Sequence, residues 1–187
     1  MSEREIPALS NEILEEVAAA VRAVDGRDLN ALVAELEGTR RVFCVGAGRS
    51  GILLQAFCMR LNHLGFEAYM AGGLPCPPVA QGDLLVVASG SGETRSVAAI
   101  VTLGRSAGAR VAMFTARRDA GIIDADVCIV VPAPTLLVNA EGPTSRQPMR
   151  TLFEQVLFVL CESVVWGLKA RNSIGEEEMA RRHANLE

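Results

Sequence analysis

Two glycine-rich turns, each directly after a short apolar run, constrain this chain more than any other feature of its sequence. The first turn is residues 46–51 (Gly-Ala-Gly-Arg-Ser-Gly) after residues 42–45, and the second is residues 89–94 (Ser-Gly-Ser-Gly-Glu-Thr) after residues 84–88. A buried strand that leads through such a turn into a helix presents free backbone N–H groups and a partial positive charge. Glycine lets the backbone turn sharply and approach a ligand closely. The sequence therefore predicts that the two turns bind one phosphate-bearing molecule.

Apolar, β-rich runs alternate with helical patterns along the middle of the chain. We expect strands at residues 41–45, 66–70, 84–88, 110–114 and 127–131. The helices expected between them are at residues 50–64 and 94–107, with a short one near Ala120. Continuously apolar strands are typical of parallel sheets buried on both faces. The pattern predicts an α/β fold, a doubly wound five-stranded parallel sheet flanked by helices, with ligands at the carboxyl ends of its strands.

Helical periodicity continues on both sides of this alternating region. Residues 9–37 predict two helices, residues 151–170 a helix that is apolar nearly all round, and residues 176–186 a polar helix. A length of 187 residues is that of one domain. We expect that domain to consist of N-terminal helices at 1–38, the parallel core at 39–132 and C-terminal helices at 149–187.

Composition and charge exclude several classes of function. The net charge of −4 argues against nucleic acid as a partner. No apolar run reaches the ~18 residues of a membrane span, and the polar N-terminus is unlike a secretory signal, so we expect a cytoplasmic protein. The five cysteines are odd in number and lack C-x-x-C spacing, which predicts neither a disulfide framework nor a zinc site.

The first glycine turn also has the spacing of a dinucleotide-binding fingerprint, through Gly46, Gly48 and Gly51. That interpretation requires an acidic residue at the end of the second strand to hold the ribose. The second expected strand is followed by residues 71–73 without one, and Glu67 stands at its beginning. We therefore expect no NAD or FAD, although a turn that serves packing alone stays an alternative.

The second turn adds hydroxyl groups to its glycines. Ser89, Ser91 and Thr94 surround Gly90 and Gly92, and short hydroxyl side chains beside exposed amides suit a phosphate dianion. A competing interpretation is that Thr94 only caps the helix that follows.

These two turns resemble those of the sugar-isomerase (SIS) domain family, whose members bind phosphosugars. Further matching segments are residues 56–65, 147–149, 152–155 and 182–187, and the last two are more specific to the hexuloisomerase family within it. One departure is Arg150-Thr151, where relatives usually carry Gly-Ser. The resemblance covers nearly the whole chain.

The resemblance implies that D-arabino-3-hexulose 6-phosphate is converted to D-fructose 6-phosphate through a cis-enediolate, as in the ribulose monophosphate pathway of formaldehyde fixation. That keto shift needs a base and an acid, and neither a cofactor nor a metal where fixed dipoles hold the oxyanion. Relatives also suggest a homotetramer. The alternatives are an arabinose-5-phosphate or other aldose–ketose isomerase, and a non-catalytic phosphosugar sensor.

Two residues are expected to move protons. Glu154 lies in an apolar stretch where desolvation strengthens a carboxylate as a base, although a carboxylate at a helix N-terminus can simply face solvent. The resemblance implies that His183, from a neighbouring subunit, acts as an acid or base or opens the furanose ring of the product. Arg49 is expected to clamp the substrate or to pair with Glu154. The expected substrate-binding residues are Gly48, Arg49, Ser50, Ser89, Gly90, Ser91, Gly92, Glu93 and Thr94.

Overall fold

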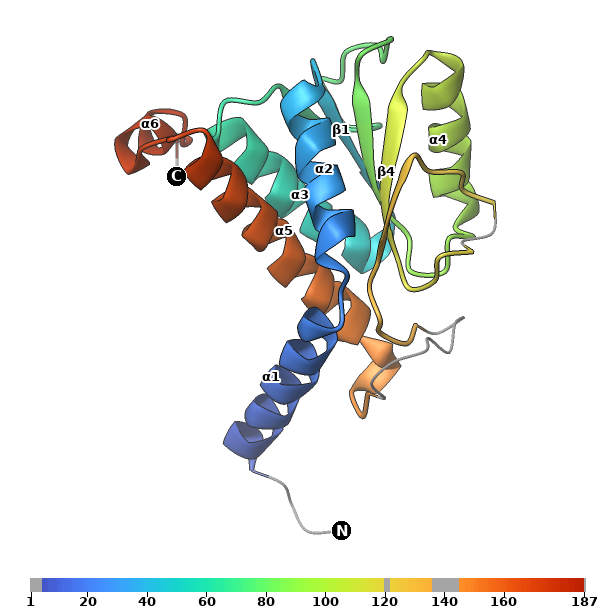
Figure 1. Cartoon of the computed structure of the whole chain (residues 1–187), viewed down its shortest axis with the longest axis vertical. Coiled ribbons are helices and arrows are strands. Elements are labelled where there is room, and N and C mark those ends of the chain that lie inside the picture. Colours follow the sequence, from blue (N-terminus) through green and yellow to red (C-terminus); the bar gives the residue numbers. More distant parts are fainter. Residues whose placement is uncertain (1–4, 120–121, 136–144, 187) are drawn as a thin grey trace.

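Five parallel strands form the central sheet in the order β2-β1-β3-β4-β5 (Figure 1). They are β1 (Val42–Gly46), β2 (Ala68–Met70), β3 (Leu84–Ala88), β4 (Arg110–Thr115) and β5 (Val127–Val130). The structure, a computed structural model, describes residues 5–119, 122–135 and 145–186. All five expected strands are present, close to their predicted bounds. The predicted doubly wound α/β fold is confirmed.

The described residues also form six α-helices and one short 3-10 helix. They are α1 (Ile6–Arg22), α2 (Gly26–Gly38), α3 (Gly48–His63), α4 (Arg95–Ser106), η1 (Pro148–Arg150), α5 (Leu152–Arg171) and α6 (Glu176–Arg181). The predicted helix at 176–186 is five residues too long, because the chain leaves helical geometry after Arg181. The helix expected near Ala120 falls partly outside the described residues. Asp25 caps α2 by accepting a 2.9 Å hydrogen bond from the Arg27 N–H.

Alternate residues of each strand face two different cores, which explains why the strands are apolar throughout. Val42 and Cys44 of β1 pack into a cluster with α2, α3 and α5. Phe43 and Val45 pack into a second cluster with α4 on the other face. Figure 1 shows α2 and α3 on one side of the sheet and α4 on the other.

The two glycine turns leave neighbouring strands in opposite directions. β1 and β3 are hydrogen-bonded, with Gly46 opposite Ala88 in the register. The chain after β1 enters α3 on one face, and the chain after β3 enters α4 on the other. This reversal is the topological switch point, where open α/β sheets bind ligands. The fold therefore places both turns at the expected ligand-binding edge.

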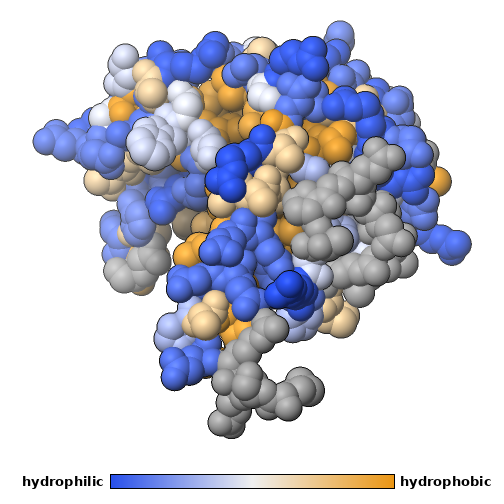
Figure 2. All heavy atoms as spheres, turned by 60° about the horizontal axis from the view of Figure 1, so that its bottom comes forward, coloured by the Kyte–Doolittle hydropathy of each residue, from blue (hydrophilic) through white to orange (hydrophobic). Residues whose placement is uncertain are grey.

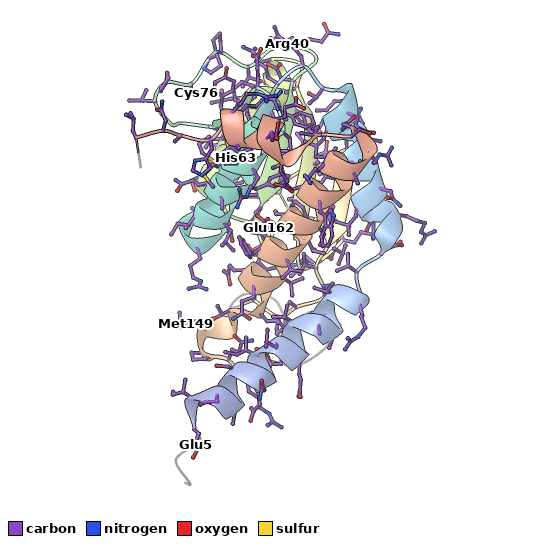
Figure 3. The ribbon with its side chains drawn as sticks, turned by 90° about the vertical axis from the view of Figure 1, so that its left-hand side faces the viewer. Glu5, Arg40, His63, Cys76, Met149 and Glu162 are labelled. Atoms are coloured by element: carbon purple, nitrogen blue, oxygen red, sulfur yellow. The ribbon has the colours of Figure 1, made fainter. Side chains whose placement is uncertain are left out.

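Helices α3 and α5 pack along each other. The first glycine turn lies at the beginning of α3, and His63 lies at its other end. In Figure 3, Met149 lies beside the beginning of α5, Glu162 lies along the helix, and His63 lies at the far end of α3. Helix α1 projects beyond the sheet at the end where α5 begins (Figure 1). No helix in the described part of the chain has the length and hydropathy needed to cross a membrane.

Candidate functional site

The first glycine turn combines one packing contact with one open position. A Cβ atom on Gly51 would lie 2.7 Å from the carbonyl oxygen of Gly46, so these two glycines bring the end of β1 against the start of α3. Gly48 has a φ of +55° and open space around its Cα, and Arg49 beside it is exposed. Ser50 is buried. Packing thus explains Gly46 and Gly51, while Gly48 and Arg49 face the open edge of the sheet.

Hydroxyl groups of the second turn bond within the turn itself. The Ser89 and Thr94 hydroxyl oxygens are 3.0 Å apart, and the Ser91 hydroxyl accepts a 3.2 Å bond from the Glu93 N–H. Thr94 is the N-cap residue of α4, but its side chain makes no cap bond, so the capping interpretation of its hydroxyl is wrong. The three hydroxyls are therefore held by hydrogen bonds around one tight loop.

Gly90 and Gly92 of this turn are each required by the local structure, for different reasons. Gly92 has a φ of +69°, a conformation that side chains rarely adopt. A Cβ on Gly90 would lie 2.6 Å from the Cγ2 atom of Thr135 and 3.5 Å from the Phe153 ring. The close approach at Gly90 brings the beginning of α5 against the second turn, and Thr135 is a neighbour that no sequence motif indicated.

Glu154 lies next to both turns. It follows Phe153, which packs against Gly90, and the Arg49 guanidinium is close enough to lower the pKa of its carboxyl. Burial has the larger effect and raises the pKa of Glu154 above its ordinary value. The side chain is half-buried. A carboxylate with a raised pKa beside a cation is suited to take a proton from carbon.

Three charged residues that follow β3 and β4 form ion pairs within the chain. Glu93 is exposed, and its carboxylate lies 3.8 Å from the guanidinium of Arg117, which also binds Asp119 at 2.7 Å. Arg118 binds Asp28 of α2 at 2.7 Å. Arg117 and Arg118 are therefore engaged in ion pairs within the chain.

His183 lies at the opposite end of the molecule from Glu154. Its ring stacks on that of His63, the last residue of α3, while Arg49 stands at the first turn of the same helix. His63 is fourteen positions after Arg49 on this helix, which corresponds to about 21 Å along its axis. Within one chain, the structure brings Glu154 together with both glycine turns and does not bring His183 to them.

The short segment before α5 has a defined conformation that sequence analysis did not indicate. Met149 has a left-handed φ of 56°, and the Thr151 hydroxyl donates a 2.6 Å bond to the Pro148 carbonyl. Thr151 stands where relatives usually carry Ser, and its hydroxyl makes this hydrogen bond within the segment. Across the described residues, no group of three or more His, Cys, Asp or Glu side chains is placed to hold a metal ion.

Comparison with known proteins gives close relatives over nearly the full length. The chain is 40% identical over 176 residues to a 3-hexulose-6-phosphate isomerase of Mycobacterium gastri, covering 94% of this chain and 88% of the relative. It is 34% identical to a protein of the same name from Bacillus subtilis, covering 94% and 96% of the two chains. No protein-family model matches the chain.

Solved structures agree. A hypothetical protein from Methanococcus jannaschii, whose crystal structure was reported to infer a molecular function of 3-hexulose-6-phosphate isomerase, superposes with a TM-score of 0.79 at 28% identity. The match covers 95% of this chain and 96% of that one. From the sequence identity, the coverage and the shared fold, the chain belongs to the 3-hexulose-6-phosphate isomerase family.

Proposed function

We propose that this protein interconverts D-arabino-3-hexulose 6-phosphate and D-fructose 6-phosphate. The observation that carries the proposal is the position of Glu154, a half-buried carboxylate with a raised pKa, beside both glycine turns at the switch point of the sheet. Its relatives from Mycobacterium gastri and Bacillus subtilis are named for this substrate.

The second turn grips the phosphate in this proposal. Ser89, Ser91 and Thr94 hold their hydroxyls around two glycines at the start of α4. When a phosphate enters, these hydroxyls turn from one another to the ester oxygens, and the N-terminus of α4 adds its partial positive charge. The phosphate anchors one end of the sugar and so fixes its reacting carbons relative to α5.

Glu154 is the base in this mechanism. It removes the proton from C2 of the 3-ketose, and the C2 electron pair forms the double bond of a 2,3-enediolate as the C3 carbonyl takes up the negative charge. Transfer of the O2 proton to O3 and return of a proton to C3 then give the 2-ketose. Arg49, whose guanidinium acts on the Glu154 carboxyl, stabilises the charge on the enediolate oxygens.

A second subunit supplies His183. Within one chain, His183 is separated from Glu154 by about the length of α3, which is too far for both to contact one substrate. A site that contains both residues therefore needs a second copy of the chain. Hydrophobic residues lie among hydrophilic ones on the face that Figure 2 shows. Large exposed apolar side chains on α1, α3 and α5 include Ile6, Leu14, Ile52, Met59, Phe158 and Trp166. We propose that copies of the chain associate into a homotetramer through the exposed faces of these three helices.

The cellular setting follows from the substrate. A 3-hexulose 6-phosphate arises when formaldehyde adds to a pentulose phosphate, so the proposed place of this enzyme is the ribulose monophosphate pathway, in the cytoplasm. Neither a cofactor nor a metal enters the proposed steps.

A coupled assay tests the function. A 3-hexulose-6-phosphate synthase supplies the substrate, and fructose 6-phosphate is read through phosphoglucose isomerase and glucose-6-phosphate dehydrogenase as NADPH. Arabinose 5-phosphate is offered in parallel. Turnover of the hexulose phosphate with little or none of the pentose phosphate supports the proposal. The reverse preference, or binding of both without turnover, would contradict it in favour of the aldose–ketose isomerase or the sensor.

A further inference from the structure

One carboxylate of α1 holds the segment that leads into α5. Glu16 accepts a 2.7 Å hydrogen bond from the Ser145 hydroxyl, a 3.0 Å bond from the Arg146 backbone N–H and a 2.9 Å bond from the Gln147 side-chain amide. The Ser145 hydroxyl accepts in turn from the Gln147 N–H at 3.2 Å. Three donors that are 129 to 131 residues away in the sequence thus converge on one side chain. We call this arrangement the Glu16 clasp.

The clasp is continuous with the proposed base. Gln147 is followed by η1, in which Met149 takes its left-handed conformation and the Thr151 hydroxyl bonds back to Pro148. Helix α5 begins at the next residue, and Glu154 lies in its first turn. No long flexible connection lies between them, so a shift of residues 145–147 moves the start of α5 and the carboxylate of Glu154.

The charge of Glu16 suits this task. Burial alone would raise the pKa of its carboxyl, but the three hydrogen bonds and the nearby Arg146 guanidinium lower it below the ordinary value. Arg146 also lies 3.8 Å from Glu12, one turn earlier on α1. Charge-assisted hydrogen bonds of this kind are about twice as strong as neutral ones. The Glu16 clasp is therefore a strong contact, and it fixes residues 145–147, which lead into α5, relative to α1.

We propose that Glu16 is a positioning residue for the isomerase reaction, which sets the orientation of Glu154 through residues 145–147. This inference rests on the proposed function of Glu154 as the base. Glu16 itself does not touch the substrate. Because a misplacement of about 1 Å can cost a reaction about a hundredfold in rate, loss of the clasp is expected to lower kcat more than it changes KM.

The hydrogen-bond pattern allows a reversal test. Glu16→Gln leaves one side-chain oxygen for three donors and removes the negative charge, and Gln147→Glu puts two carboxylates opposite each other. The double variant Glu16→Gln/Gln147→Glu again pairs a donor with an acceptor, with polarity reversed. In it, the side-chain carbonyl oxygen at position 16 still accepts from the Arg146 N–H. Glu15→Gln is the matched control, because Glu15 is exposed on the same helix.

Three measurements on each variant separate positioning from stability: kcat and KM in the coupled assay, the melting temperature, and hydrogen exchange at the Arg146 amide. Each single variant is expected to lose about tenfold or more in kcat with KM within about threefold, and to exchange this amide faster. The double variant should recover most of the kcat and the protection. Glu15→Gln should match the unaltered protein.

Two results would overturn the inference. One is faster exchange at Arg146 with an unchanged kcat in the single variants, because an open clasp would then have no effect on the reaction. The other is a double variant that is no better than the poorer single variant while its melting temperature is normal. Failure of the unaltered protein to turn over the hexulose phosphate would instead contradict the proposed function, and amide exchange would still report the clasp.

Discussion

The imidazole rings of His63 and His183 stack, with their centroids 5.0 Å apart and their planes at 23°. Next to His183, the Arg182 guanidinium donates a 3.2 Å hydrogen bond to the His63 carbonyl at the end of α3. The same guanidinium covers Gly65, where a Cβ would lie 3.0 Å from it. The segment after α6 is thus fixed to the end of α3 that lies away from the glycine turns.

This position makes a specific prediction for mixed oligomers. Glu154→Gln and His183→Ala should each abolish most of the activity alone, and mixing the two chains under subunit exchange should restore part of it, because some sites then combine an intact Glu154 with an intact His183. A mixture of Glu154→Gln with the double variant Glu154→Gln/His183→Ala is the control and should stay inactive. No recovery in verified mixed oligomers would contradict a site shared between subunits.

The pH dependence of kcat/KM reports the surroundings of Glu154. Since burial raises the pKa of this carboxyl, the acidic limb should lie above the ordinary glutamate value of about 4.3. Arg49 lowers the same pKa, so Arg49→Ala should move the acidic limb to higher pH, whereas Arg49→Lys should move it less. An acidic limb that stays at the same pH in Arg49→Ala would show that the two residues do not interact in the working enzyme.

The raised pKa of Glu154 also has a consequence for stability. In the folded protein the protonated form is favoured, so its contribution to stability is complete below the unfolded-state pKa and is lost as the pH rises through the folded-state pKa. Glu154→Gln, which mimics the protonated form, should therefore be at least as stable as the unaltered protein at pH 7. Chemical unfolding at pH 7 measures this, and a clearly destabilised variant would contradict it.

A substitution at Gly51 tests whether the first turn packs the end of β1 against the start of α3. A Cβ at this position would meet the backbone carbonyl of Gly46 at 2.7 Å, and a backbone atom cannot move aside as a flexible side chain can. Gly51→Ala should therefore lower the free energy of unfolding by about 2 kcal/mol or more. Gly26→Ala is the matched control, since no atom lies within 4 Å of its added Cβ, and its effect should stay within about 0.5 kcal/mol. Equal effects of the two variants would contradict the close contact.

Asp83 lies just before β3, at the edge of the sheet away from the glycine turns, and links the beginnings of β1 and β3. Its side chain is fully buried and binds Arg41 at 2.8 Å, Arg40 at 3.2 Å and the Ala80 N–H at 2.8 Å. Burial alone would raise the pKa of Asp83, but these partners lower it, so its contribution is present above the unfolded-state pKa and is lost as the pH falls through the folded-state value.

Asp83→Asn should cost about 3 kcal/mol at pH 7 because it leaves two guanidinium groups without their carboxylate. The difference from the unaltered protein should shrink as the pH falls below the ordinary aspartate value of about 3.9, because the unfolded chain then takes up a proton before the folded protein, in which the pKa of Asp83 is lower. Denaturant unfolding at pH 7 and pH 3 measures both values. A difference that is the same at the two pH values would exclude a charge effect.

The sheet and the position of both glycine turns at the carboxyl ends of its strands could be predicted from the chain because they depend on local pattern. Residues 84–88 are apolar on both faces and are followed at once by a turn that only glycine can make, and the structure has a strand with these bounds and a φ of +69° at Gly92. The raised pKa of Glu154 likewise follows from its apolar neighbours in the sequence.

Other features depend on contacts between distant segments, and no local pattern contains them. Thr94 looks like a helix cap from its neighbours, yet its hydroxyl bonds with Ser89 inside the turn. The Glu16 clasp joins residues 129 or more positions apart, so Glu16 looks like an ordinary helix carboxylate until the fold is known. The spacing of Gly46 and Gly51 suggested a ligand turn, whereas their backbones meet each other.

Exchange of carbon-bound hydrogen tests the central claim most directly. Fructose 6-phosphate is incubated with the enzyme in D2O, and its C3 proton is followed by NMR. The unaltered protein should exchange this proton for deuterium as the enediolate forms and re-forms, and Glu154→Gln should bind the sugar phosphate but leave the C3 proton in place. Exchange by Glu154→Gln at the rate of the unaltered protein would contradict the assignment of Glu154 as the base.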